Sequence, residues 1–64
     1  MILQLRKLRL LKGLSQEELS ERSNISKHIL IGLENGDITI TTTKTLLKIA
    51  EVLNCSVNQF FLHN

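Results

Sequence analysis

The sequence has 64 residues, of which 42% are apolar and 22% are charged, and its formal net charge is +2. These values predict one small folded domain over residues 1–64 and exclude an intrinsically disordered chain. Cys55 is the only cysteine, so no disulfide forms within the chain and the reducing cytosol is favoured. No apolar run approaches the ~20 residues that a membrane-spanning helix needs.

The first third of the chain predicts two short helices. Leucines at helical spacing predict a helix from Ile2 to Lys12, and Gly13 suits its C-terminal end. Ser15 and Glu18 form a capping-box pattern, in which each side chain satisfies a backbone amide of the other residue. A second helix is therefore expected over residues 16–23.

A tight turn connects the second helix to a third. Asn24 suits a left-handed backbone conformation, and Ser26 is a good N-cap for a helix over residues 27–35. Small Ser20 allows the two helices to approach closely. Four apolar residues supply a shared seam: Leu19, Ile25, Leu30 and Leu33. Two short helices joined in this way are a helix-turn-helix.

The remainder of the chain predicts a loop and two more helices. Residues 38–42 are expected to be extended, because no second strand is available to pair with them. Thr42 or Thr43 caps a fourth helix that ends at Asn54, and a Ser-x-x-Gln pattern at residues 56–59 opens a short fifth helix. The expected fold is all-α, a compact bundle of five short helices.

Five collinear stretches resemble the XRE/Cro-type helix-turn-helix family, whose fold is that of lambda-repressor-like DNA-binding domains. The stretches lie between Leu5 and Phe61 and read KGLSQEEL at 12–19, IS at 25–26, LENG at 33–36, TLLKIA at 45–50, and Val57 with Phe60-Phe61. The resemblance implies sequence-specific binding to double-stranded DNA by a transcriptional regulator, with the third helix in the major groove.

The resemblance leads us to expect a small dimeric repressor of phage or mobile-element type that acts in the cytoplasm, at the nucleoid. We expect no enzymatic activity, because no acid–base or nucleophile arrangement is present, and no cofactor or metal. The resemblance also implies a buried ion pair between Arg9 and Glu34. The dimer interface is expected on apolar residues near the C-terminus, namely Val57, Phe60, Phe61 and Leu62.

The expected DNA contacts come from helix starts, from the third helix and from the loop after it. By resemblance, Gln16 contacts a phosphate and braces the third helix, whose first residues reach base edges. With Leu30 and Leu33 facing the core, a rotation of about 100° per residue turns His28, Ile31, Gly32 and Asn35 outward. The full expected set is Gln16, Ser26, Lys27, His28, Ile29, Ile31, Gly32, Asn35, Thr39, Thr41, Thr42 and Lys44.

The outer face of the third helix departs from the family pattern. Ile29, Ile31 and Gly32 occupy positions that are usually polar or basic, and Gly32 falls where a longer base-contacting side chain is common. The following loop carries Asp37, which repels phosphate, so modest affinity is expected. The alternative is a protein-interaction module on the same scaffold, an antitoxin or antirepressor, with an apolar patch around Ile29, Ile31 and Ile38. A protein partner that acts as inducer or antirepressor fits either reading.

Overall fold

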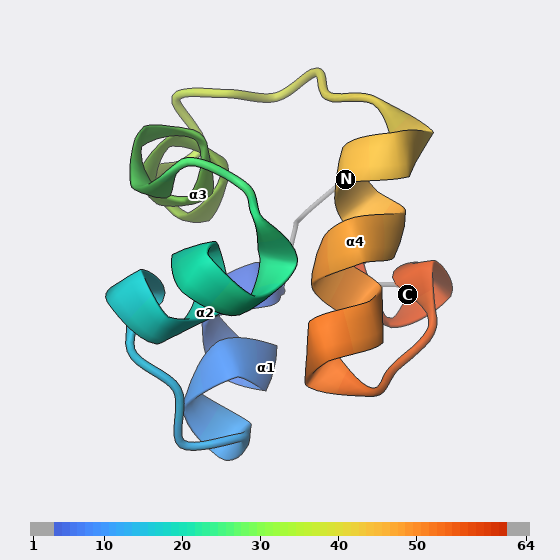
Figure 1. Cartoon of the computed structure of the whole chain (residues 1–64). Helices are drawn as coiled ribbons and strands as arrows, with labels where there is room; N and C mark the ends of the chain where they lie inside the picture. The colour runs from blue at the N-terminus through green and yellow to red at the C-terminus, as the bar shows by residue number, and fades with distance from the viewer. Residues whose placement is uncertain (1–3, 62–64) are drawn as a thin grey trace.

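The computed structural model describes residues 4–61. In chain order, the elements are α1 (Leu5–Leu11), α2 (Gln16–Ser23), α3 (Lys27–Asn35), α4 (Thr43–Leu53) and a short 3-10 helix, η1 (Val57–Phe60). α2 packs against both α3 and α4, α1 contacts α3, and η1 packs on α4. Figure 1 shows the α3–α4 loop crossing the top of the molecule between these two helices. The described residues thus form an all-α bundle without strands.

Each element contributes large apolar side chains to one core. The fully enclosed side chains are Leu5, Leu19, Leu30, Ile49, Leu53 and Phe60. Ile49 and Leu53 lie four residues apart on α4, and Leu30 lies three residues before buried Leu33 on α3, so each of these two helices presents an apolar stripe inward. Removal of this apolar surface from water is the main force that holds the bundle together. Among residues 4–61, no helix combines the length and the apolar character that crossing a bilayer requires.

Side-chain caps fix where α2, α3 and α4 begin. The Ser15 hydroxyl accepts from the Glu18 amide at 3.0 Å, and the Glu18 carboxylate accepts from the Ser15 amide at 3.1 Å. Ser26 accepts from the Ile29 amide at 3.2 Å, and Thr42 accepts from the Thr45 amide at 3.1 Å. The expected bounds of α2 and α3 are the observed ones, because the caps depend only on neighbouring residues.

The two ends of the bundle differ from the sequence prediction. α1 begins at Leu5, because Gln4 is non-helical and its backbone amide donates to the carbonyl of Phe60. Ile2 and Leu3, where the helix was expected to begin, lie outside the described residues. The expected fifth helix is a single 3-10 turn, in which Gln59 still accepts from the Ser56 amide at 2.9 Å. The turn ends where Phe61 becomes extended, at φ −103° and ψ 140°.

Candidate nucleic-acid interface

The turn between α2 and α3 holds the two helices in a fixed relation. Asn24 has φ 59° and ψ 33°, which is the left-handed conformation expected from the sequence. The Ser20 hydroxyl donates to the Ile25 carbonyl at 2.6 Å and so ties the turn back onto α2. Ile25 is itself buried in the core. The direction in which α3 leaves the turn is therefore set by backbone conformation and packing together.

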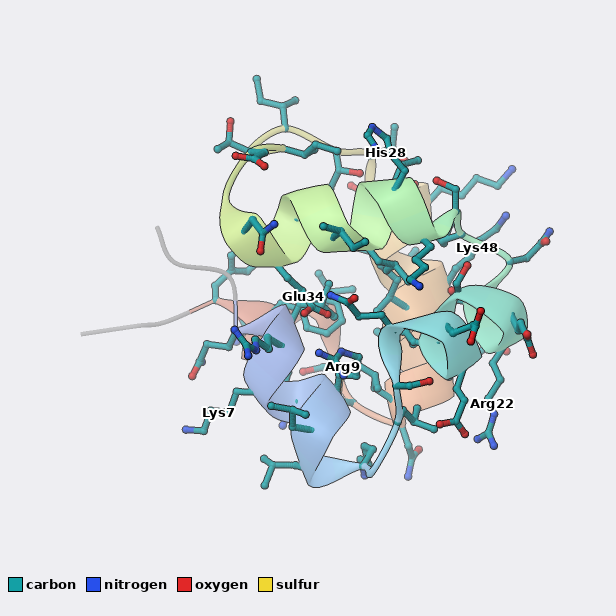
Figure 2. The ribbon with its side chains drawn as sticks, turned by 90° about the vertical axis from the view of Figure 1, so that its left-hand side faces the viewer. Lys7, Arg9, Arg22, His28, Glu34 and Lys48 are labelled. Atoms are coloured by element: carbon teal, nitrogen blue, oxygen red, sulfur yellow. The ribbon has the colours of Figure 1, made fainter. Side chains whose placement is uncertain are left out.

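A buried ion pair fixes the other end of α3 to α1. Arg9 Nε lies 2.8 Å from Glu34 Oε2, and Arg9 Nη2 donates to Glu34 Oε1 at 3.0 Å. The side chains are only 8% and 2% exposed, and Figure 2 shows them pointing toward one another between α1 and α3. Arg9 Nη1 also donates to the Leu14 carbonyl at 2.8 Å. The hydrogen bonds that Arg9 donates to the Glu34 carboxylate raise the pKa of Arg9 above its usual value.

Gln16 joins the same network from the start of α2. Its Nε2 donates to Glu34 Oε1 at 3.2 Å, so one carboxylate receives hydrogen bonds from both α1 and α2. Gln16 is half-buried, which leaves part of the side chain at the surface. The side chain thus braces α3 through Glu34 and remains partly open to solvent at the start of α2.

The outer face of α3 carries exposed polar residues at its two ends. Lys27, His28 and Asn35 are exposed, and Ile31 between them is half-buried. In Figure 2, His28 projects from the side of α3 that faces away from Glu34 and α1. Ile29 is half-buried and packs against the core, so it contributes less open surface than the sequence suggested. The face offers hydrogen-bond donors that can reach the base edges of a nucleic acid.

Gly32 does not lie on the open surface as expected, because it is buried. Ile38 from the following loop covers it, and the Ile38 amide donates to the Gly32 carbonyl at 2.9 Å. Helical spacing places Gly32 on the outer face correctly, but it cannot reveal that a loop residue folds over that position. Ile38 is half-buried and also packs against the core, so the expected apolar patch is smaller than predicted.

The loop after α3 and the start of α4 bring several polar groups beside this face. Thr39, Thr42 and Lys44 are exposed, and Thr41 is half-buried. Ser26 and Thr42 both use their hydroxyl oxygens as helix caps. The hydroxyl oxygen is therefore engaged with a backbone amide in each, and the Thr42 hydroxyl also donates to Thr45 Oγ1 at 3.0 Å.

The C-terminal residues expected at a dimer interface are placed differently. The prediction is wrong for Phe60, which is 0% exposed because its ring fills the core where η1 packs on α4. Val57 and Phe61 are half-buried, and Leu62 lies outside the described residues. Phe61 instead lines a hollow of about 560 Å³, together with Leu33, Ile38, Ile40 and Leu46.

The sequence prediction did not include this hollow, although Ile40 lies in the stretch 38–42 that it expected to be extended. Ile40 is 89% exposed, which makes it the most exposed large apolar side chain that the structure describes. The hollow also combines residues from α3, the loop, α4 and the C-terminal segment, which only the tertiary fold brings together. A pattern along the sequence does not predict that these four segments meet.

Two other kinds of site were considered for the described residues, a metal site and a reactive cysteine. Residues 4–61 contain no group of three His, Cys, Asp or Glu side chains that could hold a metal ion. Cys55 is half-buried, and its burial raises the pKa of the thiol, which lowers its reactivity as a nucleophile. The interface on α3 is therefore the strongest candidate site.

Comparison with known proteins gives a family match over most of the chain. A family model described as helix-turn-helix matches residues 5–60, which is nearly the whole chain. No curated protein matches the chain at a significant level. The match covers α1 to η1 and includes the α2–α3 turn.

Proposed function

Since the chain belongs to the XRE-type helix-turn-helix family of DNA-binding regulators, we propose that it reads double-stranded DNA in a sequence-specific manner with α3 in the major groove. The observation that carries the proposal is the exposed face of Lys27, His28 and Asn35 on a helix that is fixed at both ends. A reading helix must be rigid, because small displacements misalign its hydrogen bonds with base edges.

Each exposed group has a role that follows from its chemistry. Lys27 and His28 donate to guanine acceptors or to a phosphate, and Ile31 contacts a thymine methyl group. Gln16, Asn35 and Lys44 hold the phosphate backbone, together with the hydroxyls of Ser26, Thr39, Thr41 and Thr42. Few of these groups are charged, so we expect modest affinity.

We further propose that the protein binds its operator as a homodimer. Two copies related by a twofold axis would present their α3 helices about 34 Å apart, to half-sites one helical turn apart. The apolar residues Ile40, Leu46 and Phe61, which line part of the hollow, are the surface that supports this. It replaces the interface that the sequence predicted around Phe60. The substitution Ile40→Asp at this exposed position should shift the protein toward monomer in sedimentation velocity without unfolding it.

The regulatory role that we propose is repression, of the phage or mobile-element kind. A small dimer seated on an operator blocks other proteins from the same DNA, which requires no catalytic step. A protein partner that binds the same face would release the DNA. The proposed site of action is the cytoplasm, where the DNA of the nucleoid is accessible.

Selection of bound duplexes from a random pool tests the proposal, followed by titration of the selected duplex at several salt concentrations. We expect an inverted repeat, saturable binding and a measurable salt slope. Weak binding without sequence preference would refute sequence-specific recognition. Tight capture of a protein without any DNA preference would favour the interaction module instead.

A further inference from the structure

A loop residue occupies the outer face of α3 at the one position where that helix has no side chain. Gly32 lies on the same stripe as exposed His28 and Asn35, four residues after one and three before the other. A Cβ atom built on Gly32 would lie 2.5 Å from Ile38 Cδ1 and 2.6 Å from Ile38 Cγ1. Those separations are too short for non-bonded atoms, so Ile38 fills the space that a side chain at position 32 would occupy.

The glycine is explained by this contact and not by its backbone conformation. Gly32 has no positive φ, unlike Gly13 and Gly36. In the middle of a helix glycine is a poor choice, because it lacks a side chain and loses more backbone entropy than alanine. Here it provides room, and the hydrogen bond from the Ile38 amide to its carbonyl, 2.9 Å long, holds the loop in register.

We propose that Ile38 is a specificity-determining residue that reads DNA in place of the missing side chain of α3. The inference rests on the proposed function and adds a reader from outside the recognition helix. Ile38 is half-buried, so part of its side chain remains open, and the position that it covers, Gly32, lies on the stripe of His28 and Asn35. An aliphatic side chain in the major groove contacts the thymine methyl group and donates no hydrogen bond. Ile38 should therefore favour thymine at one position of each half-site.

The test compares selected base preferences for four proteins: the wild type, Ile38→Ala, Gly32→Ala and the double variant Gly32→Ala/Ile38→Ala. Gly32→Ala keeps Ile38 but pushes it aside, whereas Ile38→Ala removes it. The double variant relieves the clash, since the new Cβ then faces only Ile38 Cβ, at 3.3 Å. Leu11→Ala, which truncates an aliphatic side chain that is 70% exposed on α1, is the matched control. Circular dichroism establishes that each variant is folded.

We expect Ile38→Ala and Gly32→Ala to weaken the preference at the same base pair of each half-site, by about three- to fivefold, as the burial of one methyl-sized contact implies. The double variant should bind DNA with the same weakened preference, and Leu11→Ala should select the wild-type sequence. An unchanged preference in folded Ile38→Ala, or a uniform affinity loss at all positions, would show that Ile38 only packs. Failure of the wild type to select any sequence would overturn the proposed function, and this inference with it.

Discussion

Arg9 and Glu34 join α1 to α3 through a buried ion pair, to which Gln16 connects α2. Both are nearly closed to water, and the structure gives each charge several partners. A buried ion pair of this kind offers limited net stability, but loss of one partner leaves the other charge buried and uncompensated. The pair thus holds α1, α2 and α3 together mainly because any movement that separates the two charges would leave one of them buried without a partner.

We expect Glu34→Ala to lower the free energy of unfolding by about 3–5 kcal/mol, because Arg9 then remains buried without its carboxylate. Urea unfolding measures this change. Arg6→Ala, which truncates an exposed arginine on the same helix, should cost less than about 0.5 kcal/mol. Similar small losses for both variants would mean that Arg9 reaches water when Glu34 is absent.

Glu18 gives a prediction for pH. The Ser15 amide donates a hydrogen bond to the Glu18 carboxylate, and this bond is the main cause that lowers the pKa of Glu18 below its ordinary value of 4.5. The hydrogen bond with the Ser15 hydroxyl is the second cause. Its folded pKa thus lies below its unfolded pKa, so the ionised form stabilises the fold above the unfolded pKa. This contribution disappears as the pH falls through the folded pKa.

The wild type should therefore lose more stability than Glu18→Gln between pH 7 and about pH 3, since glutamine does not titrate. Thermal unfolding at several pH values checks this. Glu17→Gln is the matched control, because Glu17 neighbours the capping box without belonging to it. An equal acid response in wild type and Glu18→Gln would contradict the assignment.

Local signals in the sequence fix both ends of α3. Its start is fixed by the Ser26 cap and the left-handed Asn24, and its end by Gly36 at φ 83°. These signals are local, so α3 has the same limits in the sequence prediction and in the structure. Its orientation is not local, because it depends on Ile25, Leu30 and Leu33 reaching the core.

Substitution of Asn24 tests the turn. Asn24→Val should destabilise the fold by about 1–2 kcal/mol, because a β-branched residue disfavours positive φ, and it should weaken DNA binding beyond the unfolded fraction. Asn24→Gly should be close to neutral. Glu51→Val, at an exposed helical position of α4, is the control for the general effect of valine. Equal effects at positions 24 and 51 would show that the left-handed conformation is unimportant.

Charge is distributed unevenly over the whole molecule. In Figure 2, Lys7 and Arg22 lie on the side of the ribbon away from His28, so they do not surround the proposed reading face. Few cations remain beside α3, with Lys27 at its start and Lys44 near the start of α4. The net charge of +2 thus overstates the positive field at the interface.

This distribution predicts a shallow salt dependence of DNA binding. Lys27→Ala should reduce the slope of log K against log salt by about 0.9 per chain, as expected for one lost phosphate contact on duplex DNA. Lys7→Ala should leave the slope unchanged. Fluorescence anisotropy across a salt series distinguishes the two. A larger effect from Lys7 would place the DNA on α1 instead.

The sequence alone determined the limits of α2 and α3, the caps and the left-handed turn, because each depends on residues a few positions apart. It also predicted, by family resemblance, which side chains meet in the Arg9–Glu34 pair. It could not place Phe60 in the core, fold Ile38 over Gly32 or assemble the hollow beside Phe61. Those contacts form only when the tertiary fold brings different elements together. The periodicity of residues along one helix gives no information about which other segment covers that helix.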